Sequence, residues 1–277
     1  MNSSVDLYLD LMKKCLTAYI YSESSNRPWS LRRHKRFSPT QHMKKAILLL
    51  AARRGLQIQR VIPFDAHARE YGRDWPGLGY TMIGLKRLEN IQTCIEDILN
   101  NKVAGDFIEA GVWRGGATIF MRAILQVHGI EDRNVWVADS FEGMPAPDIE
   151  KYGADKGYDL SNYEYLVAKL EDVKANFERF GLLDEHVKFL KGWFRDTLPN
   201  APINKLSILR IDGDLYESTM DVLLSLYDRV SKGGYVIIDD YYSWPPCRQA
   251  VDEFRIRRSI TSELKEIDGA GVFWMVT

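Results

Sequence analysis

The chain has 277 residues, 45% of them hydrophobic and 27% charged, and this ordinary globular composition excludes disordered, collagen-like and low-complexity chains. Its three cysteines, Cys15, Cys94 and Cys247, show neither disulfide nor zinc spacing, so we expect reduced thiols. Early acidic residues exclude a secretory signal, and no apolar run approaches the roughly 18 residues of a membrane span. We therefore expect a cytoplasmic protein without membrane contact.

Residues 1–100 are expected to form a mostly helical N-terminal appendage. An apolar stretch at 46–52 lies between basic pairs, a loop is expected at 73–79, and apolar residues recur at helical spacing over 85–98. The formal net charge is only −1, but residues 24–64 carry ten basic side chains and no Asp or Glu, so the rest of the chain carries −11. We expect this basic segment to serve oligomerisation or contact with an acidic partner. Nucleic acid is a less favoured partner, because no recognition motif accompanies the charge.

Residues 101–277 alternate between short apolar runs and helix-length segments, which predicts βαβ units around a parallel sheet. Strands are expected at 106–112, 134–140, 187–192, 205–212 and 234–241. Helices are expected at 115–128, 162–180, 216–230 and 246–258. The segments 262–268 and 272–276, joined by Gly-Ala-Gly, predict an antiparallel hairpin at one edge of this sheet.

The first two expected strands end in candidate cofactor residues, because ligands of open α/β sheets bind outside the carboxyl ends of the strands. Glu109 is followed by glycines at 111, 115 and 116, which let the backbone turn close to a ligand but do not form the GxGxxG dinucleotide fingerprint. Asp139 ends the next strand, where it can accept hydrogen bonds from ribose hydroxyls with Phe141 beside the base. The glycine turn and Asp139 together favour a cofactor that contains a nucleoside but no pyrophosphate. The alternatives are that the glycines form only a packed turn of small residues and that Asp139 only caps the following turn.

The fourth and fifth expected strands end in acids: Asp212 and Asp214 after one, Asp239 and Asp240 after the other. If these strands are neighbours, the carboxylates converge and need a positive partner, and an oxygen-only cluster suits Mg²⁺. The alternative is that some of the acids cap helices or pair with Arg210 or Arg248. A metal beside a nucleoside cofactor indicates activation of a hydroxyl, with Asp214 as candidate general base.

As an ordered set, these motifs resemble the macrocin O-methyltransferase family, S-adenosylmethionine- and Mg²⁺-dependent enzymes that methylate sugar hydroxyls of natural products. The resemblance covers about residues 70–277. Its motifs are at residues 73–76, 81–84, 107–116, 139–145, 210–216 and 238–241.

The resemblance implies a Rossmann-like class I methyltransferase sheet with an antiparallel C-terminal strand, and a homo-oligomer. It implies that Asp212, Asp239 and Asp240 bind Mg²⁺ and that Asp214 is the base. It also implies a cofactor site that includes Asp212. At the methionine end of the cofactor, Thr81, Met82, Ile83 and Gly84 fold over it, and Glu109 and Gly111 lie below it. Asp139 binds the ribose, and the adenine is bordered by Ser140, Phe141, Trp193 and Phe194.

Two further segments have candidate roles at the acceptor. Residues 143–162 are long for a strand-to-helix connection and are expected to form a lid, the alternative being a variable surface loop. The aromatic residues at 241–246 could stack on an acceptor ring or form a packed turn.

The leading interpretation is methylation of a sugar or other alcohol on a small hydroxylated or glycosylated secondary metabolite, free or bound to a carrier protein. A catechol or phenol acceptor is the alternative, but there the third ligand is usually Asn beside Asp, unlike the pair Asp239-Asp240. A non-catalytic nucleoside-binding protein is a further alternative, and the intact acid cluster argues against it.

Overall fold

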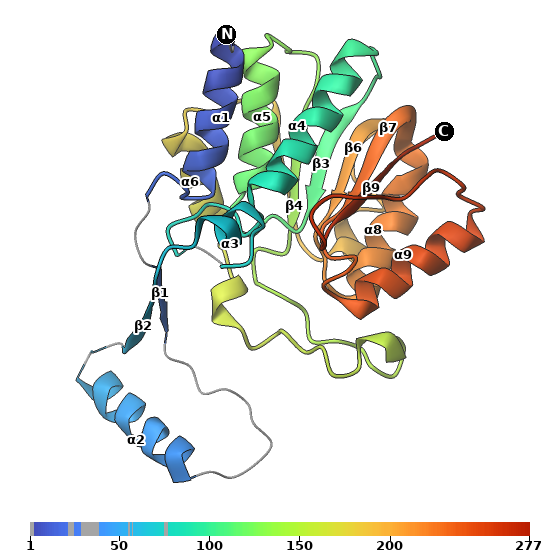
Figure 1. Cartoon of the computed structure of the whole chain (residues 1–277). Coiled ribbons are helices and arrows are strands. Elements are labelled where there is room, and N and C mark those ends of the chain that lie inside the picture. Colours follow the sequence, from blue (N-terminus) through green and yellow to red (C-terminus); the bar gives the residue numbers. More distant parts are fainter. Residues whose placement is uncertain (1–2, 22–24, 29–38, 55, 57, 75–76) are drawn as a thin grey trace.

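A computed structural model describes residues 3–21, 25–28, 39–54, 56, 58–74 and 77–277. The chain forms a seven-stranded sheet in the order β5-β4-β3-β6-β7-β9-β8 (Figure 1). Its strands are β3 (Asp106–Ala110), β4 (Val135–Asp139), β5 (Val187–Lys191), β6 (Leu206–Ile211), β7 (Val230–Ile238), β8 (Lys265–Glu266) and β9 (Val272–Met275). Neighbouring strands from β5 to β7 are parallel, whereas β9 is antiparallel to β7 and β8. The predicted α/β class with an antiparallel C-terminal hairpin is confirmed.

Helices cover both faces of this sheet, which explains why its central strands β3, β4 and β6 are mostly apolar. Successive residues of β3 alternate between two cores: Phe107 packs into one and Ile108 into the other. The first core is covered by α1 (Ser4–Leu16), α4 (Leu85–Asn100), α5 (Gly116–Val127) and α6 (Leu170–Arg179). The second is covered by α8 (Tyr216–Leu226) and α9 (Pro245–Arg257), with the short α7 (Phe194–Thr197) against α8.

Two helices of the N-terminal region belong to the first core rather than standing apart from it. Leu9 and Leu16 of α1 and Ile91 and Ile95 of α4 are fully buried in the same cluster as Phe107. The predicted boundary near residue 100 remains a prediction, but the hydrophobic core is continuous across it.

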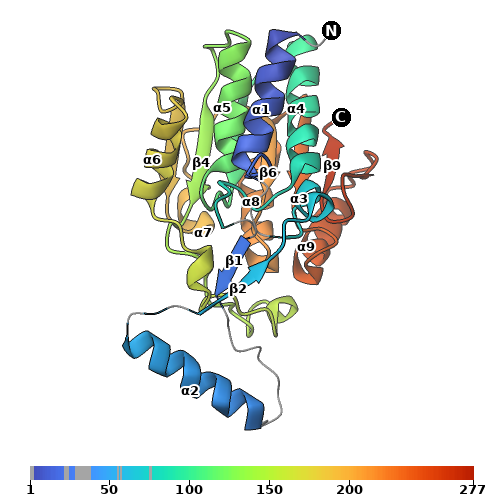
Figure 2. The same ribbon diagram turned by 60° about the vertical axis from the view of Figure 1, so that its left-hand side comes forward.

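The part of the N-terminal region that does stand apart lies within residues 25–62, here called the arm, of which 25–28, 39–54, 56 and 58–62 are described. Strands β1 (Ser25–Pro28) and β2 (Gln59–Ile62) pair antiparallel as a ribbon, which carries α2 (Pro39–Arg53) away from the body (Figures 1 and 2). The four-residue strands show no alternating apolar pattern, so the sequence did not predict them. A short helix α3 (Ala66–Glu70) leads back to the body.

Part of the predicted basic segment and of the 73–76 motif lies outside the described residues. Arg32, Arg33, Lys35 and Arg36 are not described, nor are Trp75 and Pro76. The side chains of Arg27, Lys44, Lys45 and Arg60 are not described either, while those of Arg53 and Arg54 are exposed.

The connection between β4 and α6 is longer than predicted. The helix expected from residue 162 begins at Leu170, and it is preceded by two 3-10 turns, Gly153–Asp155 and Glu164–Leu166. Residues 143–169, here called the wall segment, therefore contain no α-helix. In addition, α8 ends at Leu226, and a 3-10 turn at Tyr227–Arg229 leads into β7. No helix within the described ranges is long and apolar enough to cross a membrane.

Candidate functional site

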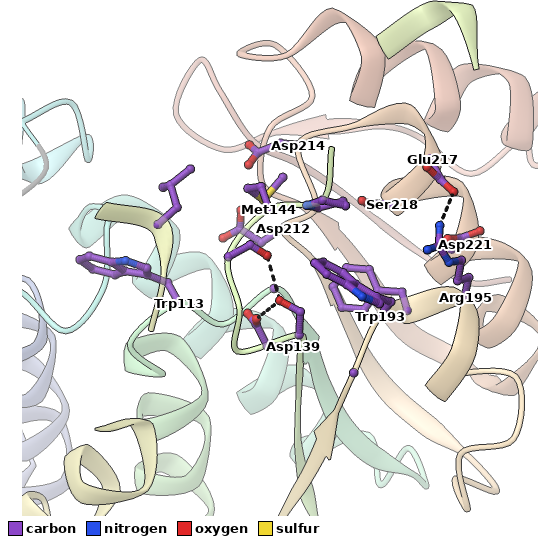
Figure 3. A pocket seen from close by; sticks show the side chains of 18 of the residues that line it. Trp113, Asp139, Met144, Trp193, Arg195, Asp212, Asp214, Glu217, Ser218 and Asp221 are labelled. Atoms are coloured by element: carbon purple, nitrogen blue, oxygen red, sulfur yellow. Dashed lines mark hydrogen bonds and ion pairs between the residues drawn. The ribbon is translucent and has the colours of Figure 1, made fainter. Parts of the chain in front are cut away.

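A pocket opens at the carboxyl ends of β3, β4, β5 and β6 and encloses about 810 Å³ of empty space, part of it open to solvent (Figure 3). Across the view of Figure 3, Asp139, Asp212 and Met144 lie between Trp113 and Trp193, and Arg195 and Asp221 lie beyond Trp193. The lining residues are Met82, Gly111, Trp113, Asp139, Ser140, Gly143, Met144, Pro145, Leu166, Gly192, Trp193, Phe194, Arg195, Asp212, Gly213, Asp214, Glu217, Ser218 and Asp221.

The glycine turn after β3 brings two strand ends unusually close. Gly111 has φ +90°, and a Cβ atom there would lie 1.9 Å from the carbonyl oxygen of Asp212. The Asp212 amide in turn donates to the Ala110 carbonyl at 2.9 Å. Only glycine combines this backbone conformation with this approach, so the residue is required where β3 meets β6.

Asp139 connects the end of β4 to the glycine turn. Its carboxylate accepts hydrogen bonds from the Val112 and Phe141 amides, each at 2.8 Å. Burial raises the pKa of Asp139, and these amides oppose the shift because they favour the charged form. Each carboxylate oxygen can accept further bonds, so Asp139 stays available to a ligand in the pocket.

The residues after Asp139 point in different directions. The hydroxyl of Ser140 donates to the Gly143 carbonyl at 2.8 Å, and Ser140 lines the pocket. Phe141, with φ +57°, is buried in the first core, with its ring centroid 6.5 Å from that of Phe189.

Residues 80–84, here called the covering segment, lie tightly against the start of α5. The Gly116 amide donates to the Tyr80 carbonyl at 3.0 Å, and a Cβ at Gly116 would lie 2.6 Å from that oxygen. Within the segment only Met82 lines the pocket, whereas Thr81 and Ile83 are buried. Gly84 packs against residues 70–72, where a Cβ would lie 2.2 Å from the Glu70 carbonyl oxygen.

Three carboxylates, here called the acid triad, converge beside the pocket: Asp212, Asp214 and Asp240 each offer an oxygen within 4.8 Å of the others. Burial, followed by repulsion from Asp212, raises the pKa of Asp214 to about 7. Burial and the neighbouring carboxylates likewise raise the pKa of Asp240 well above its ordinary value. Among the described residues, Asp240 Oδ2 is buried with no hydrogen-bond partner. Ionising all three carboxylates together would therefore concentrate negative charge at this site.

Asp239 lies in a second group, here called the arginine network. The buried Arg210 donates to Glu109, to Asp239 and, at 3.1 Å, to Asp212. Arg87 of α4 donates to Asp239 and, at 2.8 Å, to Asp268. Pairing with Arg210, the alternative left open by the sequence, thus occurs for two of the four acids, Asp212 and Asp239. Arg248 instead lies over Tyr241, 5.3 Å from its ring centroid.

The network places Glu109 away from the pocket surface. Its side chain is almost fully buried, and burial raises the pKa of Glu109 to about 8 against the opposing effect of Arg210. Arg87 was missed by sequence reasoning because it is 152 residues from Asp239, and only the tertiary structure brings the two together.

The acid triad has the donor chemistry of a magnesium site. Mg²⁺ prefers hard oxygen ligands at about 2.0–2.1 Å in an octahedron, so ligand oxygens of one ion lie at most roughly 4 Å apart. The carboxylate oxygens of the triad lie within 4.8 Å of one another, close to this separation. A cation would also offset the repulsion that raises the pKa of Asp214 and Asp240.

The pocket contains about half of the residues that were predicted to bind a cofactor. Those in its lining are Met82, Gly111, Asp139, Ser140, Trp193, Phe194 and Asp212. Those outside it are Thr81, Ile83, Gly84, Glu109 and Phe141. Trp113, Arg195, Glu217 and Asp221 line the pocket although none was predicted to do so. Trp113 lies inside the quoted glycine motif, so its position was the available signal; the other three belong to α7 and α8 and carried none.

The wall segment supplies Met144, Pro145 and Leu166 to the pocket. It is held at its far end by the Trp113 indole, which donates to the Tyr165 carbonyl at 2.9 Å. Its predicted role as a lid remains a prediction.

The aromatic residues at 241–246 do not line this pocket. Tyr241 is buried and its hydroxyl donates to Asp252 at 2.6 Å, as expected of a packed turn.

Comparison with known proteins gives a consistent result. The family described as Macrocin-O-methyltransferase (TylF) matches residues 5–276. Demethyldecarbamoylnovobiocin O-methyltransferase of Streptomyces niveus is 47% identical over the whole chain and 95% of the relative. The 8-demethyl-8-(2,3-dimethoxy-alpha-L-rhamnosyl)-tetracenomycin-C 4'-O-methyltransferase of Streptomyces olivaceus is 49% identical over 98% of the chain and 93% of the relative. Mycinamicin III 3''-O-methyltransferase of Micromonospora griseorubida is 44% identical over 99% of the chain and 97% of the relative.

Solved structures agree with these matches. The O-methyltransferase NovP superposes with a TM-score of 0.84 at 45% identity, covering 99% of this chain and 100% of NovP. The calicheamicin methyltransferase CalS11 has a TM-score of 0.55 at 18% identity, covering 91% of this chain and 98% of CalS11, which supports the fold alone.

Proposed function

The chain belongs to the macrocin O-methyltransferase family, and we propose that its acceptor is a hydroxyl group on the sugar of a glycosylated natural product. It is an S-adenosylmethionine-dependent O-methyltransferase. The observation that carries the acceptor proposal is near full-length identity of 44–49% to three methyltransferases named for antibiotic-type substrates, one of them a rhamnosyl compound.

The pocket residues have the chemistry that a nucleoside cofactor needs. Asp139, Trp193 and Phe194 line the pocket, and in this proposal Asp139 accepts from ribose hydroxyls while the two aromatic rings lie against the adenine. Met82 and Gly111 border the methionine end in this proposal. S-adenosylmethionine supplies the methyl group, whose transfer to the acceptor oxygen leaves S-adenosylhomocysteine and a methyl ether.

For the acceptor hydroxyl we propose a Mg²⁺ site formed by Asp212, Asp239 and Asp240, with Asp214 as the general base. The cation would lower the pKa of a hydroxyl that binds it. Asp214 lines the pocket, and its carboxylate lies within 4.8 Å of those of Asp212 and Asp240, so it can accept a proton released beside the cation and pass it to solvent. Asp239 keeps lone pairs for this role although two arginines donate to it.

A methylation assay with isolated protein tests the function. We expect methyl transfer to a glycoside that carries a free sugar hydroxyl, no transfer to its aglycone, and loss of transfer in EDTA that Mg²⁺ restores. Transfer to a catechol in preference to the glycoside would overturn the acceptor class, and undiminished transfer in EDTA would overturn the metal role.

Paired variants test the roles of the acids. Asp212→Ala and Asp239→Ala should abolish Mg²⁺-stimulated methylation while S-adenosylhomocysteine still binds by calorimetry. Asp214→Asn should retain Mg²⁺ binding and lose most turnover. If Asp214→Asn loses Mg²⁺ binding and Asp239→Asn keeps it, the third ligand is Asp214, as the grouping of the acid triad also permits.

We also propose that the arm mediates homo-oligomer formation. The side chains of Met43, Ile47, Leu49 and Leu50 on α2 are exposed and apolar, and the basic segment is opposite in charge to the rest of the chain. Deleting residues 1–60 would also remove the core residues of α1. Because Ser25 pairs with Ile62, residues 26–61 can instead be replaced by a short Gly-Ser link. An unchanged mass by light scattering would refute this role.

A further inference from the structure

One buried arginine joins the covering segment to the acids at the end of β7. Arg87 is 9% exposed and lies in the first turn of α4, three residues after Gly84. Its guanidinium donates to Asp239 and, at 2.8 Å, to Asp268. The other oxygen of Asp268 accepts from the Ala270 and Gly271 amides at 3.1 and 3.0 Å, so the C-terminal hairpin fixes that carboxylate.

At the other end, residues 77–80, which lead into the covering segment and include its first residue, are fixed to the cofactor side of the site. Arg114 donates to the carbonyls of Gly77 and Gly79 at 2.8 and 2.9 Å, and Tyr80 accepts from Gly116 in the glycine turn. Met82 lines the pocket while its neighbour Ile83 is buried in the first core. Met82 is thus three residues from the start of α4 and five from Arg87, so a ligand that touches Met82 acts on the chain that positions Arg87.

The charges make this connection more than a packing contact. Glu109, Arg210, Asp239, Arg87 and Asp268 alternate in sign through consecutive ion pairs, so Asp239 is held between two cations. The next residue, Asp240, belongs to the acid triad, which has an unpartnered buried oxygen within the described part of the chain. Because Asp240 directly follows Asp239 in the chain, the orientation of Asp239 affects where the Asp240 carboxylate lies and the electrostatic potential at the triad.

We propose that Arg87 is a positioning residue that couples cofactor binding to cation binding. Cofactor in contact with Met82 would restrain the covering segment, and with it Arg87, in the position in which Arg87 donates to Asp239, so less freedom remains to be lost when the acids bind a cation. By reciprocity, the cation tightens cofactor binding by the same factor. This inference rests on the proposed cofactor pocket and Mg²⁺ site.

The test is calorimetric titration of Mg²⁺ into the protein with and without saturating S-adenosylhomocysteine. In the wild-type chain we expect the cofactor product to tighten Mg²⁺ binding about fivefold or more. In Arg87→Met the ratio should fall to about one. Arg122→Met is the matched control, because Arg122 is also buried and pairs with Asp184 at 2.6 Å, outside the pocket lining. It should lose comparable thermal stability and keep the wild-type ratio.

Two milder variants keep the test informative if Arg87→Met does not fold. Asp268→Asn retains the oxygen that accepts from the Ala270 and Gly271 amides but removes the oxygen that accepts from Arg87. Arg87→Lys keeps the positive charge but lacks the branched guanidinium that bridges two carboxylates. Both should lower the ratio. A wild-type ratio in these variants, or a ratio of one in the wild-type chain, overturns the inference while leaving the metal site intact. A wild-type chain that binds no Mg²⁺ overturns the metal site itself and the coupling with it.

Discussion

Asp155 should anchor the wall segment of the pocket, and replacing it tests how the site is held together. It is fully buried within a segment whose other residues are mostly exposed. Its two carboxylate oxygens accept from the backbone amides of Tyr216 and Glu217 at 2.7 and 3.2 Å. The N-cap residue of α8, Leu215, has no side chain able to do this, so the distant Asp155 caps the helix.

The expected cost of Asp155→Ala follows from these contacts. Loss of a helix cap lowers the free energy of unfolding by typically about 1 kcal/mol and by up to about 2 kcal/mol. We expect the larger value here, because the Asp155 side chain is enclosed by the protein. Burial raises the pKa of Asp155, which shows that the folded chain bears a cost for desolvating this carboxylate. Asp155→Ala removes that cost together with the cap, so the net loss of stability is no larger than this. About 2 kcal/mol corresponds to a fall in Tm of roughly 4–8 °C for a chain of this size.

Thermal unfolding and limited proteolysis measure the effect. Asp155→Ala should melt earlier and be cleaved faster within residues 143–169, whereas Asp155→Asn, which keeps one acceptor oxygen, should lose about half as much stability. Asp148→Ala is the control, because Asp148 is exposed and accepts only a local bond from the Lys151 amide, at 3.1 Å. If Asp155→Ala and Asp148→Ala are indistinguishable in both measurements, Asp155 does not anchor the segment.

Three further outcomes are expected. Gly111→Ala should abolish S-adenosylhomocysteine binding or folding, because its Cβ would meet the Asp212 carbonyl oxygen at 1.9 Å. At the control position Gly129, with φ +65° and nothing within 4 Å of an added Cβ, the change to Ala should lower the free energy of unfolding by only about 1 kcal/mol, as measured by thermal unfolding. Equal effects of the two changes would contradict the close approach at Gly111. Trp193→Ala should weaken S-adenosylhomocysteine binding about 5- to 100-fold by calorimetry if its ring stacks on adenine, and unchanged affinity would exclude that stacking. Burial, followed by repulsion from Glu217, raises the pKa of Asp221 from 3.8 to about 6. The folded chain therefore holds this proton more tightly than the unfolded chain does, and it loses stability as the pH rises between these two values. Asp221→Asn should remove this loss, and a Tm difference from wild type that stays constant with pH would contradict it.

Much of the body was predictable because its central strands are buried on both faces. The runs that became β3, β4 and β6 are mostly apolar and end in or are followed by acids or glycine, a pattern typical of the central parallel strands of an α/β sheet, whereas the edge strand β5 is only partly buried. The arm ribbon and the late start of α6 were not predictable. Residues 25–28 and 59–62 carry no alternating pattern, and residues 162–169 have helix-compatible composition but lie along the pocket, where tertiary contacts override propensity.

By itself the sequence determined the order of the elements and which residues end each strand. Parallel strands carry their carboxyl ends to one edge, so Asp139, Asp212 and Asp240 had to lie along the same edge of the sheet. Only the tertiary structure decided how the acids divide. Asp214 joins the acid triad and Asp239 joins the arginine network because α4 brings Arg87 to the end of β7. No local pattern encodes that pairing, since buried charges take the partners that long-range packing places within reach.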